Sequence, residues 1–273
     1  VALTQHNAKR GLQTCGKAAS DVVLKDVKQL HDRKTVRPRA SRDLTMQEKR
    51  DALACLMFIK EKRCGTIKAR GCADGRKQRL CKTKEETSSP AVRTESLMLS
   101  CVIDAKERRK AITCDTPGAF MQVDVDEVVH VRLVGELAAL LTKVDPKSCT
   151  EHMTTEHGKP VLCVQLQKAL HGALSAAMLF WKYLSGHLTD EGFEPNPCDS
   201  CVMNKTVDGS QCTVLWHVDD LKLSHVDGNV NEQVLDRLNM RCGKETPLTV
   251  TRGDIHECLG MTIDYGTAGK VIT

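Results

Sequence analysis

Two adjacent carboxylates, Asp219 and Asp220, stand between two short apolar runs. Residues 212–216 and 221–225 are rich in the residue types that strands favour, so the acidic pair is predicted at a hairpin tip. Because neighbouring negative charges repel, both carboxylates are costly in a closed site unless a cation neutralises them. Oxygen ligands suit a hard ion such as Mg²⁺. The alternative is a solvated turn, where Asp is common.

A third carboxylate, Asp115, follows a short buried strand predicted over residues 111–114. Thr116-Pro117-Gly118 then breaks the strand. Two strand ends that bring three carboxylates together can hold two Mg²⁺ ions, the arrangement used for in-line phosphoryl transfer. Asp115, Asp219 and Asp220 are therefore candidate metal-binding residues.

The composition allows one large domain or two smaller ones in 273 residues. Aromatic residues make up only 3% of the chain, so the core is built mostly from Leu, Val, Ile, Met, Ala and Cys. The net charge of +5 is mild, but ten Lys or Arg residues lie between Lys60 and Lys84 against Glu61 and Asp74. Such a run indicates either a solvated face or a phosphate-binding surface.

The 14 cysteines lack the regular spacing of a disulfide framework, and we interpret them as mostly free thiols in a reducing compartment. Cys198-x-x-Cys201 is half of a zinc-site pattern, but no second pair follows, so two thiols on a turn or strand is the favoured interpretation. No apolar run approaches the roughly 20 residues of a membrane span. The ends at Val1 and Thr273 lead us to expect a fragment of a longer protein.

Helices are expected where apolar residues recur at helical spacing. Ser20 is a candidate cap for a first helix, and Thr45 with Glu48 forms a capping box for a second. Ser89-Pro90 is expected to open a third helix. The buried positions expected in the first two are Val23, Val27 and Leu30, and then Leu53, Leu56 and Ile59. Further helices are expected over residues 135–144, 170–188 and 228–240.

Strands are expected over residues 128–134, 161–166 and 258–264, besides the runs around the acidic residues. Residues 200–204 and 211–218, joined by Asp208-Gly209, predict a hairpin leading into the acidic tip. The basic stretch from Gly65 to Arg79 is expected to be a strand pair or a loop that carries cations.

Six stretches, taken in order, resemble the copia-type retrotransposon reverse transcriptases. Each is short, but their collinear order makes the resemblance specific from about residue 45 to the end. They are Gly65-Thr66-Ile67-Lys68-Ala69-Arg70, Ser89-Pro90-Ala91-Val92, Asp115-Thr116-Pro117-Gly118-Ala119-Phe120, Leu166-Gln167-Lys168-Ala169-Leu170-His171-Gly172, His217-Val218-Asp219-Asp220 and Leu259-Gly260-Met261.

The resemblance implies an α+β fold, the fingers and palm of a right-hand polymerase, with an antiparallel palm sheet and helices packed on one face. It implies four segments along the chain. These are an N-terminal basic extension or linker (1–43), fingers (44–110), a palm with a finger insertion (111–245), and the palm end with a truncated start of the thumb connection (246–273).

The resemblance also implies roles for individual residues in an RNA-directed DNA polymerase. Asp115 and Asp219 match the metal-binding aspartates, with Asp220 supporting them, and the implied cofactor is a pair of Mg²⁺ ions, with Mn²⁺ as the alternative. Phe120 matches the aromatic residue that lies beneath the sugar and excludes a 2′-hydroxyl. The remaining substrate-binding positions are Lys68, Arg70, Lys168 and Gly172.

The implied partners are an RNA or DNA template, a primer strand, deoxynucleoside triphosphates and other parts of a retroelement polyprotein, with no membrane. The implied location is the cytoplasm, within a retroelement particle, with the nucleus as the alternative.

Three positions depart from the family pattern: His217 and His171 replace aromatic residues, and Ser175 replaces a Gln that could reach a nucleotide. These changes leave the carboxylates intact but alter the expected nucleotide pocket. Two alternatives therefore stay open. One is an inactive, decayed copy, and the other is a non-enzymatic nucleic-acid-binding module that uses only the basic region.

Overall fold

The computed structural model describes residues 5–61 and 65–266. The chain divides into two compact units. The first unit consists of Val1–Ser88 and Phe120–Leu179, and the second of Ser89–Ala119 and Phe180–Thr273. Both combine helices with sheets, so the α+β class expected from the sequence is confirmed at this level.

The first unit is built on a mixed sheet in the order β1-β3-β6-β8-β2, with β4 paired to β3 and β7 paired to β8. Its strands are β1 (Gln5–Asn7), β2 (Val36–Arg39), β3 (Leu53–Glu61), β4 (Ile67–Ala73), β6 (His130–Val134), β7 (Thr154–Glu156) and β8 (Lys159–Leu166). Its α-helices are α1 (Ala8–Asp32), α2 (Met46–Asp51), α3 (Lys84–Thr87), α5 (Glu136–Val144) and α6 (Pro146–Cys149). The 3₁₀ helices are η1 (Ser41–Asp43), η2 (Gly75–Leu80) and η4 (Thr150–His152), while η3 (Ala119–Gln122) and α7 (Ala176–Asp190) run across the boundaries between the units.

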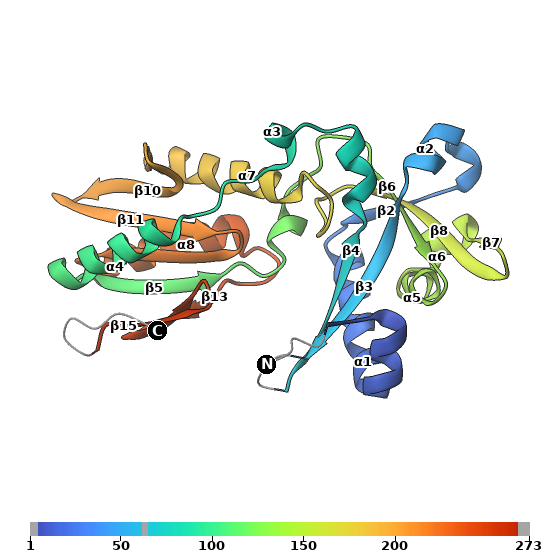
Figure 1. The fold of residues 1–273 in the computed structure, drawn as a ribbon, viewed down its shortest axis with the longest axis horizontal. Helices are drawn as coiled ribbons and strands as arrows, with labels where there is room; N and C mark the ends of the chain where they lie inside the picture. The colour runs from blue at the N-terminus through green and yellow to red at the C-terminus, as the bar shows by residue number, and fades with distance from the viewer. Residues whose placement is uncertain (1–4, 62–64, 267–273) are drawn as a thin grey trace. The chain divides into compact units, whose positions relative to one another are not determined.

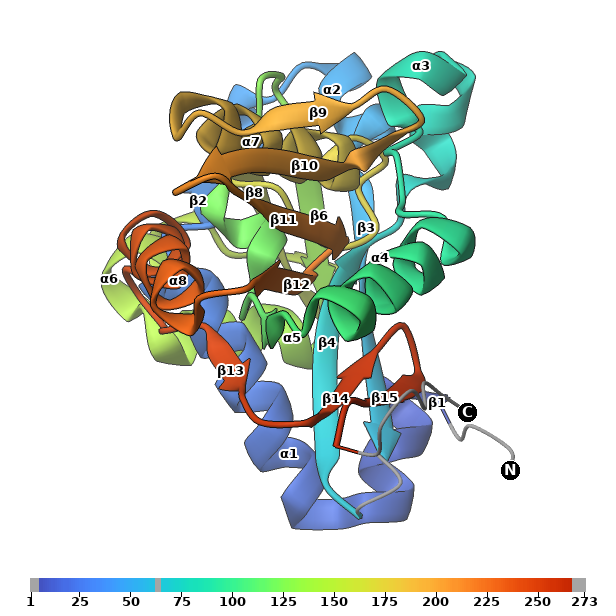
Figure 2. The same ribbon diagram turned by 90° about the vertical axis from the view of Figure 1, so that its left-hand side faces the viewer.

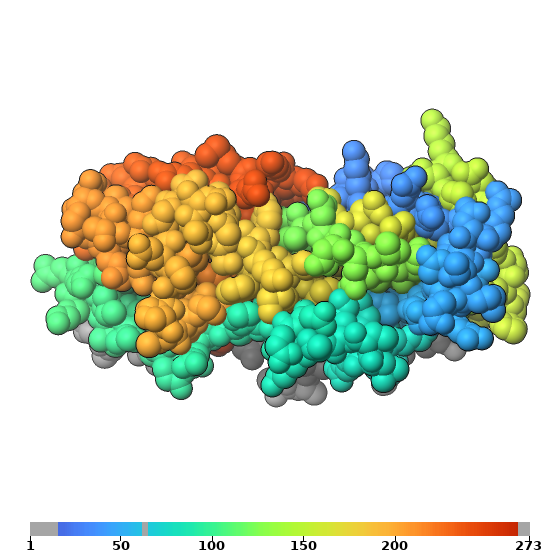
Figure 3. Space-filling model, turned by 90° about the horizontal axis from the view of Figure 1, so that it is seen from above, coloured from blue at the N-terminus to red at the C-terminus, as the bar shows by residue number. Residues whose placement is uncertain are grey.

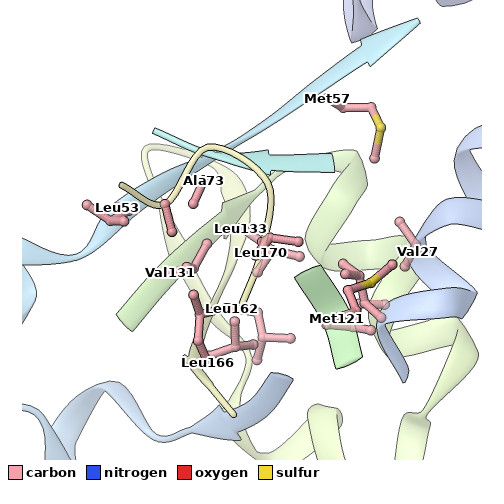
Figure 4. Close-up of a cluster of buried hydrophobic side chains, with 14 of the residues drawn as sticks. Val27, Leu53, Met57, Ala73, Met121, Val131, Leu133, Leu162, Leu166 and Leu170 are labelled. Atoms are coloured by element: carbon pink, nitrogen blue, oxygen red, sulfur yellow. The ribbon is translucent and has the colours of Figure 1, made fainter. Parts of the chain in front are cut away.

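The core of the first unit lies between this sheet and helix α1, which packs on β3, β4 and α5. The apolar stripe predicted for this helix is buried, with Val23, Val27 and Leu30 no more than 4% exposed. Figure 4 shows Val27 in one cluster with Met57 of β3, Val131 of β6 and leucines of the same unit. Packing of the apolar face of α1 against β3 and β4 therefore sets the position of the β3–β4 hairpin (Figure 1).

The second unit contains an antiparallel sheet in the order β13-β5-β12-β11-β10-β9, and a separate hairpin of β14 and β15. Figure 2 shows strands β9 to β12 following one another in this order. Its elements are α4 (Thr94–Glu107), β5 (Lys110–Asp115), β9 (Glu194–Asn196), β10 (Asp199–Val207), β11 (Ser210–His217), β12 (Asp220–His225), α8 (Gly228–Cys242), β13 (Thr249–Thr251), β14 (Ile255–Cys258) and β15 (Met261–Asp264).

The central strands of the second unit are almost fully buried, because helix α8 packs on β5 and β12 and the apolar residues of β11 lie inside. The predicted strand before Asp115 and the predicted runs around Asp219 and Asp220 are therefore confirmed as β5, β11 and β12. The predicted turn Asp208-Gly209 is confirmed as well. Both of its residues have positive φ (49° and 77°), as a two-residue hairpin turn of type I′ requires.

One predicted helix is a strand. The capping box of Thr45 and Glu48 is present, but it begins a helix of only six residues, α2. Leu53 and Ile59 are buried in β3, and Leu56 is only half-buried. Pairing with β1, β4 and β6 decides the conformation of this segment, because tertiary context overrides a weak local preference for helix.

Three predicted helix starts are also wrong. Ser20 lies inside α1, whose break is at Gly16 with φ +50°. The third predicted helix begins at Thr94 rather than after Ser89-Pro90, since the backbone N–H of Arg93 donates to Asp199 Oδ2 (2.9 Å) and holds the chain extended up to that point. The helix expected from residue 170 begins at Ala176, because the preceding loop bonds to β4 instead.

The C-terminal run predicted as one strand is a hairpin. Leu259 and Gly260 have φ values of +54° and +75°, so the chain turns between β14 and β15. The motif Leu259-Gly260-Met261 therefore forms a tight turn and the start of the returning strand. Residues 267–273, the end of the segment 246–273 expected to lead toward the thumb, lie outside the described part of the chain.

Candidate active site

The three predicted acidic residues lie at one edge of the sheet in the second unit. Asp115 ends β5, and its Cα partner in the neighbouring strand is Asp220, the first residue of β12. Asp219 is in the turn just before Asp220, and its carbonyl accepts a hydrogen bond from the backbone N–H of Thr116 (2.9 Å). The structure thus places three acidic residues that are remote in sequence at adjacent backbone positions of two strand ends.

Asp115 is held on both sides, because β13 pairs with the other edge of β5 and places Thr249 opposite it. The backbone that carries this carboxylate is therefore part of a continuous antiparallel ladder. A residue on a strand inside a sheet is positioned more rigidly than one on a free loop.

The acidic turn has an unusual backbone. His217 pairs directly with Asp220, so Val218 and Asp219 are the two central residues of the turn. Val218 has φ +57°, a region that β-branched residues rarely adopt. Such conformations cost on the order of 1–3 kcal/mol and concentrate at functional sites.

The carboxylates at this edge perturb one another. The pKa of Asp220 is raised by desolvation, then by the charge of Asp219 and that of Asp115, while His217 lowers it. More than a third of Asp220 is exposed, so solvent screens this repulsion. The arrangement is a concentration of negative charge that a bound cation would stabilise.

The donor chemistry of this edge fits Mg²⁺, because carboxylate oxygens are the ligands that hard divalent ions prefer. Asp115, Asp219 and Asp220 supply such oxygens from adjacent backbone positions. Among the described residues, no three His, Cys, Asp or Glu side chains are already gathered as a group that could hold an ion.

The predicted substrate-binding residues lie in the first unit. Lys68 and Arg70 belong to β4, and both side chains are exposed. Lys168, half-buried, forms an isolated bridge with Asp124 after the end of β8. Phe120 is half-buried, and its ring lies 4.6 Å from the ring of His171, centroid to centroid.

His171 sits close to the basic strand. Burial, and then the charges of Arg70 and Lys68, lower its pKa to about 4. The imidazole is therefore neutral at neutral pH. The backbone carbonyl of His171 accepts a hydrogen bond from the backbone N–H of Ala73 (2.7 Å). Although His171 departs from the family pattern, it packs as an aromatic ring against Phe120.

Gly172 is required by a close approach of two backbones. A Cβ at this position would lie 2.1 Å from the carbonyl oxygen of Ala73, and the residue has φ +85°. Gly75 approaches the same loop as closely, because a Cβ added at Gly75 would lie 2.3 Å from the Gly172 carbonyl oxygen. The loop and the end of β4 therefore touch through glycines, so Gly172 is needed for packing whatever its part in substrate binding.

Ser175 is tied to an ion pair that the sequence pattern did not reveal. Its hydroxyl donates to Glu127 Oε1 (3.4 Å), and the same oxygen pairs with Lys82 Nζ (2.6 Å). The adjacent backbone N–H of Leu174 donates to the side chain of Gln78 (3.0 Å). Isolated polar residues on loops carry no spacing signal, so these contacts were not predictable from sequence.

The basic region between Lys60 and Lys84 is partly occupied by contacts within the protein. Arg76 pairs with Asp74 (2.6 Å), and Lys77 Nζ donates to the Arg50 carbonyl (2.7 Å). Lys82 is engaged as well, through its ion pair with Glu127. Exposed cations of this region that carry the predicted phosphate-binding surface include Lys68, Arg70, Arg79 and Lys84.

The described cysteines from Cys55 to Cys258 are free thiols, as expected. Cys198 is exposed and Cys201 is buried. Among the helices of the described residues, none combines the length and apolarity needed to cross a bilayer.

The chain belongs to the reverse transcriptase (RNA-dependent DNA polymerase) family, whose model matches residues 57–272. This family is found in copia-type elements. The resemblance seen in the six collinear motifs is thereby confirmed. No curated protein matches the sequence.

The solved structures that the chain matches include a viral reverse transcriptase and two telomerases. A foamy viral protease–reverse transcriptase in complex with double-stranded DNA is 14% identical, with a TM-score of 0.45 over 92% of this chain and 34% of that chain. Telomerase from Candida albicans with a fragment of telomeric RNA is 8% identical, with a TM-score of 0.45 over 89% and 48%. Apo telomerase from Candida tropicalis is 9% identical, with a TM-score of 0.46 over 93% and 60%. The chain thus spans between about a third and three fifths of these chains.

Proposed function

We propose that this chain is the RNA-directed DNA polymerase domain of a copia-type retroelement polyprotein, with the second unit as palm and the first unit as fingers. The observation that carries the proposal is the pairing of Asp115 with Asp220 across β5 and β12, with Asp219 in the adjoining turn, in a chain of the reverse transcriptase family. The predicted palm sheet, with helices packed on one face, belongs to the same proposal.

The residues of the acidic edge have a defined part in this proposal. Asp115 and Asp219 would hold two Mg²⁺ ions, or Mn²⁺ in their place, and Asp220 would support them. When bound, such ions lower the pKa of a primer 3′-hydroxyl and neutralise the triphosphate and the leaving pyrophosphate. The strand ladder and the hydrogen bond from the Thr116 N–H to the Asp219 carbonyl support this proposal, because they hold the backbone positions of the three residues next to one another before substrate arrives.

The substrate-binding residues act mainly by positioning, which dominates phosphoryl transfer. Lys68 and Arg70 would bind the triphosphate through charge and hydrogen bonds. Phe120 would pack beneath the sugar, and Lys168 and Gly172 would shape the nucleotide pocket. The template and primer would bind through phosphates to the exposed cations between residues 60 and 84. We place the enzyme in a cytoplasmic retroelement particle.

The test is primer extension on a primed RNA template with Mg²⁺ and deoxynucleoside triphosphates. Asp115→Asn and Asp219→Asn should each reduce extension by at least about a hundredfold, because each removes charge aimed at the reacting phosphate. Asp208→Asn is the matched control, since Asp208 is exposed at the tip of the neighbouring hairpin and Asn tolerates its positive φ.

Thermal melting shows whether the variants fold. Removing one of the mutually repelling carboxylates should leave the melting temperature of Asp219→Asn equal to or above that of the wild type. Near-normal extension by Asp219→Asn would reject the proposed site. A folded wild-type chain that binds nucleic acid without Mg²⁺-dependent extension would instead identify a decayed copy or a binding module.

A further inference from the structure

The outer edge of β4 is held by two contacts from other parts of the first unit. Among the described strands, β4 pairs only with β3. On its other side, the backbone N–H of Gly71 donates to Asp26 Oδ2 (2.7 Å), and that of Ala73 donates to the His171 carbonyl (2.7 Å). An edge strand whose N–H groups find such partners is restrained in position.

Asp26 is well placed to fix this edge, because it belongs to helix α1 and lies next to the buried Val27. Figure 4 shows Val27 in the same cluster as Met57, the Cα partner of Gly71. A Cβ on residue 71 would lie 3.0 Å from Asp26 Oδ2, so glycine permits the close approach of the carboxylate to the strand. Helix packing and this hydrogen bond therefore act on the same point of the hairpin.

The carboxylate is also close to the two cations of the strand. Burial raises the pKa of Asp26, whereas the Gly71 hydrogen bond and the charges of Arg70 and Lys68 lower it. Arg70 directly precedes the anchored residue Gly71, and Lys68 lies two positions before Arg70 in the same strand. Anchoring the N–H of Gly71 fixes the backbone from which both side chains project.

We propose that Asp26 is a positioning residue that anchors β4 so that Lys68 and Arg70 are presented to the triphosphate of the incoming nucleotide. The proposal rests on the function proposed above for these two cations. Asp26 acts through its hydrogen bond to the strand and does not contact the substrate.

The test compares Asp26→Ala, which removes the hydrogen bond, with Asp26→Asn, which keeps an acceptor oxygen but no charge. Asp26→Ala should raise the KM for a deoxynucleoside triphosphate by about three- to tenfold, the range of one net hydrogen bond, with kcat little changed. Amide exchange at Gly71 should accelerate by about tenfold or more in the same variant. Asp26→Asn should show neither a raised KM nor fast exchange, and Asp21→Ala, at an exposed site of the same helix, is the control.

Binding of inorganic tripolyphosphate separates this proposal from the proposed function, because it needs no turnover. If Lys68→Ala/Arg70→Ala binds tripolyphosphate as the wild type does, the role assigned to the cations fails. If that double variant loses binding but Asp26→Ala retains it, the role of Asp26 is overturned. Fast exchange at Gly71 with an unchanged KM would also overturn it, since Asp26 would then be only structural.

Discussion

Single residues in this protein carry conformations that only their surroundings explain. Val218 has positive φ in the acidic turn, where glycine is the usual choice. The turn is held by the His217–Asp220 pair and by the bond from Thr116 to the Asp219 carbonyl. The pairing of β11 with β12 therefore outweighs the preference of the β-branched Val218 for negative φ, and it keeps Asp219 at the edge of the sheet.

His171 gives a testable dependence of stability on pH. Its pKa is about 4 in the folded protein against 6.5 for an ordinary histidine, with burial as the largest cause. The unfolded chain thus binds the proton more tightly, so this residue lowers stability as pH falls from about 6.5 to about 4. At 1.36 kcal/mol per pH unit, the loss is about 3 kcal/mol at most.

Replacing His171 with Phe should remove the loss of stability that His171 causes at low pH. The free energy of unfolding should then fall less steeply between pH 6.5 and pH 4, as measured by urea titration at several pH values. The exposed His157, replaced by Asn because its φ is +49°, serves as the control. An unchanged pH profile for His171→Phe would contradict the assignment.

Among the elements, β12 is tied to α4 by a buried ion pair. Lys222 Nζ bonds to Asp104 Oδ2 and to Ser100 Oγ (2.9 Å), and the Tyr265 hydroxyl donates to the same Asp104 oxygen (2.9 Å). Both charged side chains are at most 1% exposed. This group of contacts therefore joins β12, the strand that carries Asp220, to helix α4 and to Tyr265, the residue that follows β15.

Breaking this pair should be costly. Lys222→Met leaves the Asp104 charge buried and should lower the free energy of unfolding by about 3–5 kcal/mol. Lys222→Met/Asp104→Leu removes both charges and should recover most of that loss. Denaturant unfolding measures both.

The control for the buried pair is the exposed pair of Arg252 and Glu232 in the same unit (2.7 Å). Breaking it with Arg252→Gln should cost no more than about 1 kcal/mol. The account of the buried pair is wrong if Lys222→Met is no more destabilising than Arg252→Gln.

Local sequence patterns predicted some of these elements better than others. The hairpin of β10 and β11 and the strand β5 have both apolar runs and clear turn residues, so their local signal agrees with the fold. Residues 53–61 have an apolar run that suits either a helix or a strand, and pairing with three strands decided it. Helix starts failed where a distant partner, such as Asp199 for Arg93, holds the chain extended.

At the scale of the whole molecule, nucleic-acid binding is expected to depend on exposed cations of the region 60–84 other than those described above as bonded to groups of the protein itself. Segments η2 and α3 lie on the surface, as the teal region of Figure 3 shows, and Arg79 and Lys84 are exposed there. By contrast, Arg76, Lys77 and Lys82 bond to other groups of the protein. The exposed pair should therefore bind phosphates more readily.

Arg79→Gln/Lys84→Gln should weaken binding of a primed template and reduce the slope of log K against log salt by about 2, since each phosphate contact contributes about 0.9. Fluorescence anisotropy over a range of salt concentrations gives this slope. Lys25→Gln/Lys28→Gln, two exposed cations of α1, is the control of equal charge. Equal slopes for the two double variants would show that only net charge matters.

The sequence by itself determined the family, the acidic hairpin and the strand that ends at Asp115, because these depend on contiguous motifs and on local alternation. Only the tertiary structure decided that β5 pairs with β12 so that Asp115 faces Asp220, and that Asp26 anchors Gly71. The physical reason is that strand register and hydrogen bonds between remote segments are chosen by burial and pairing across the whole unit, which no short window of sequence contains.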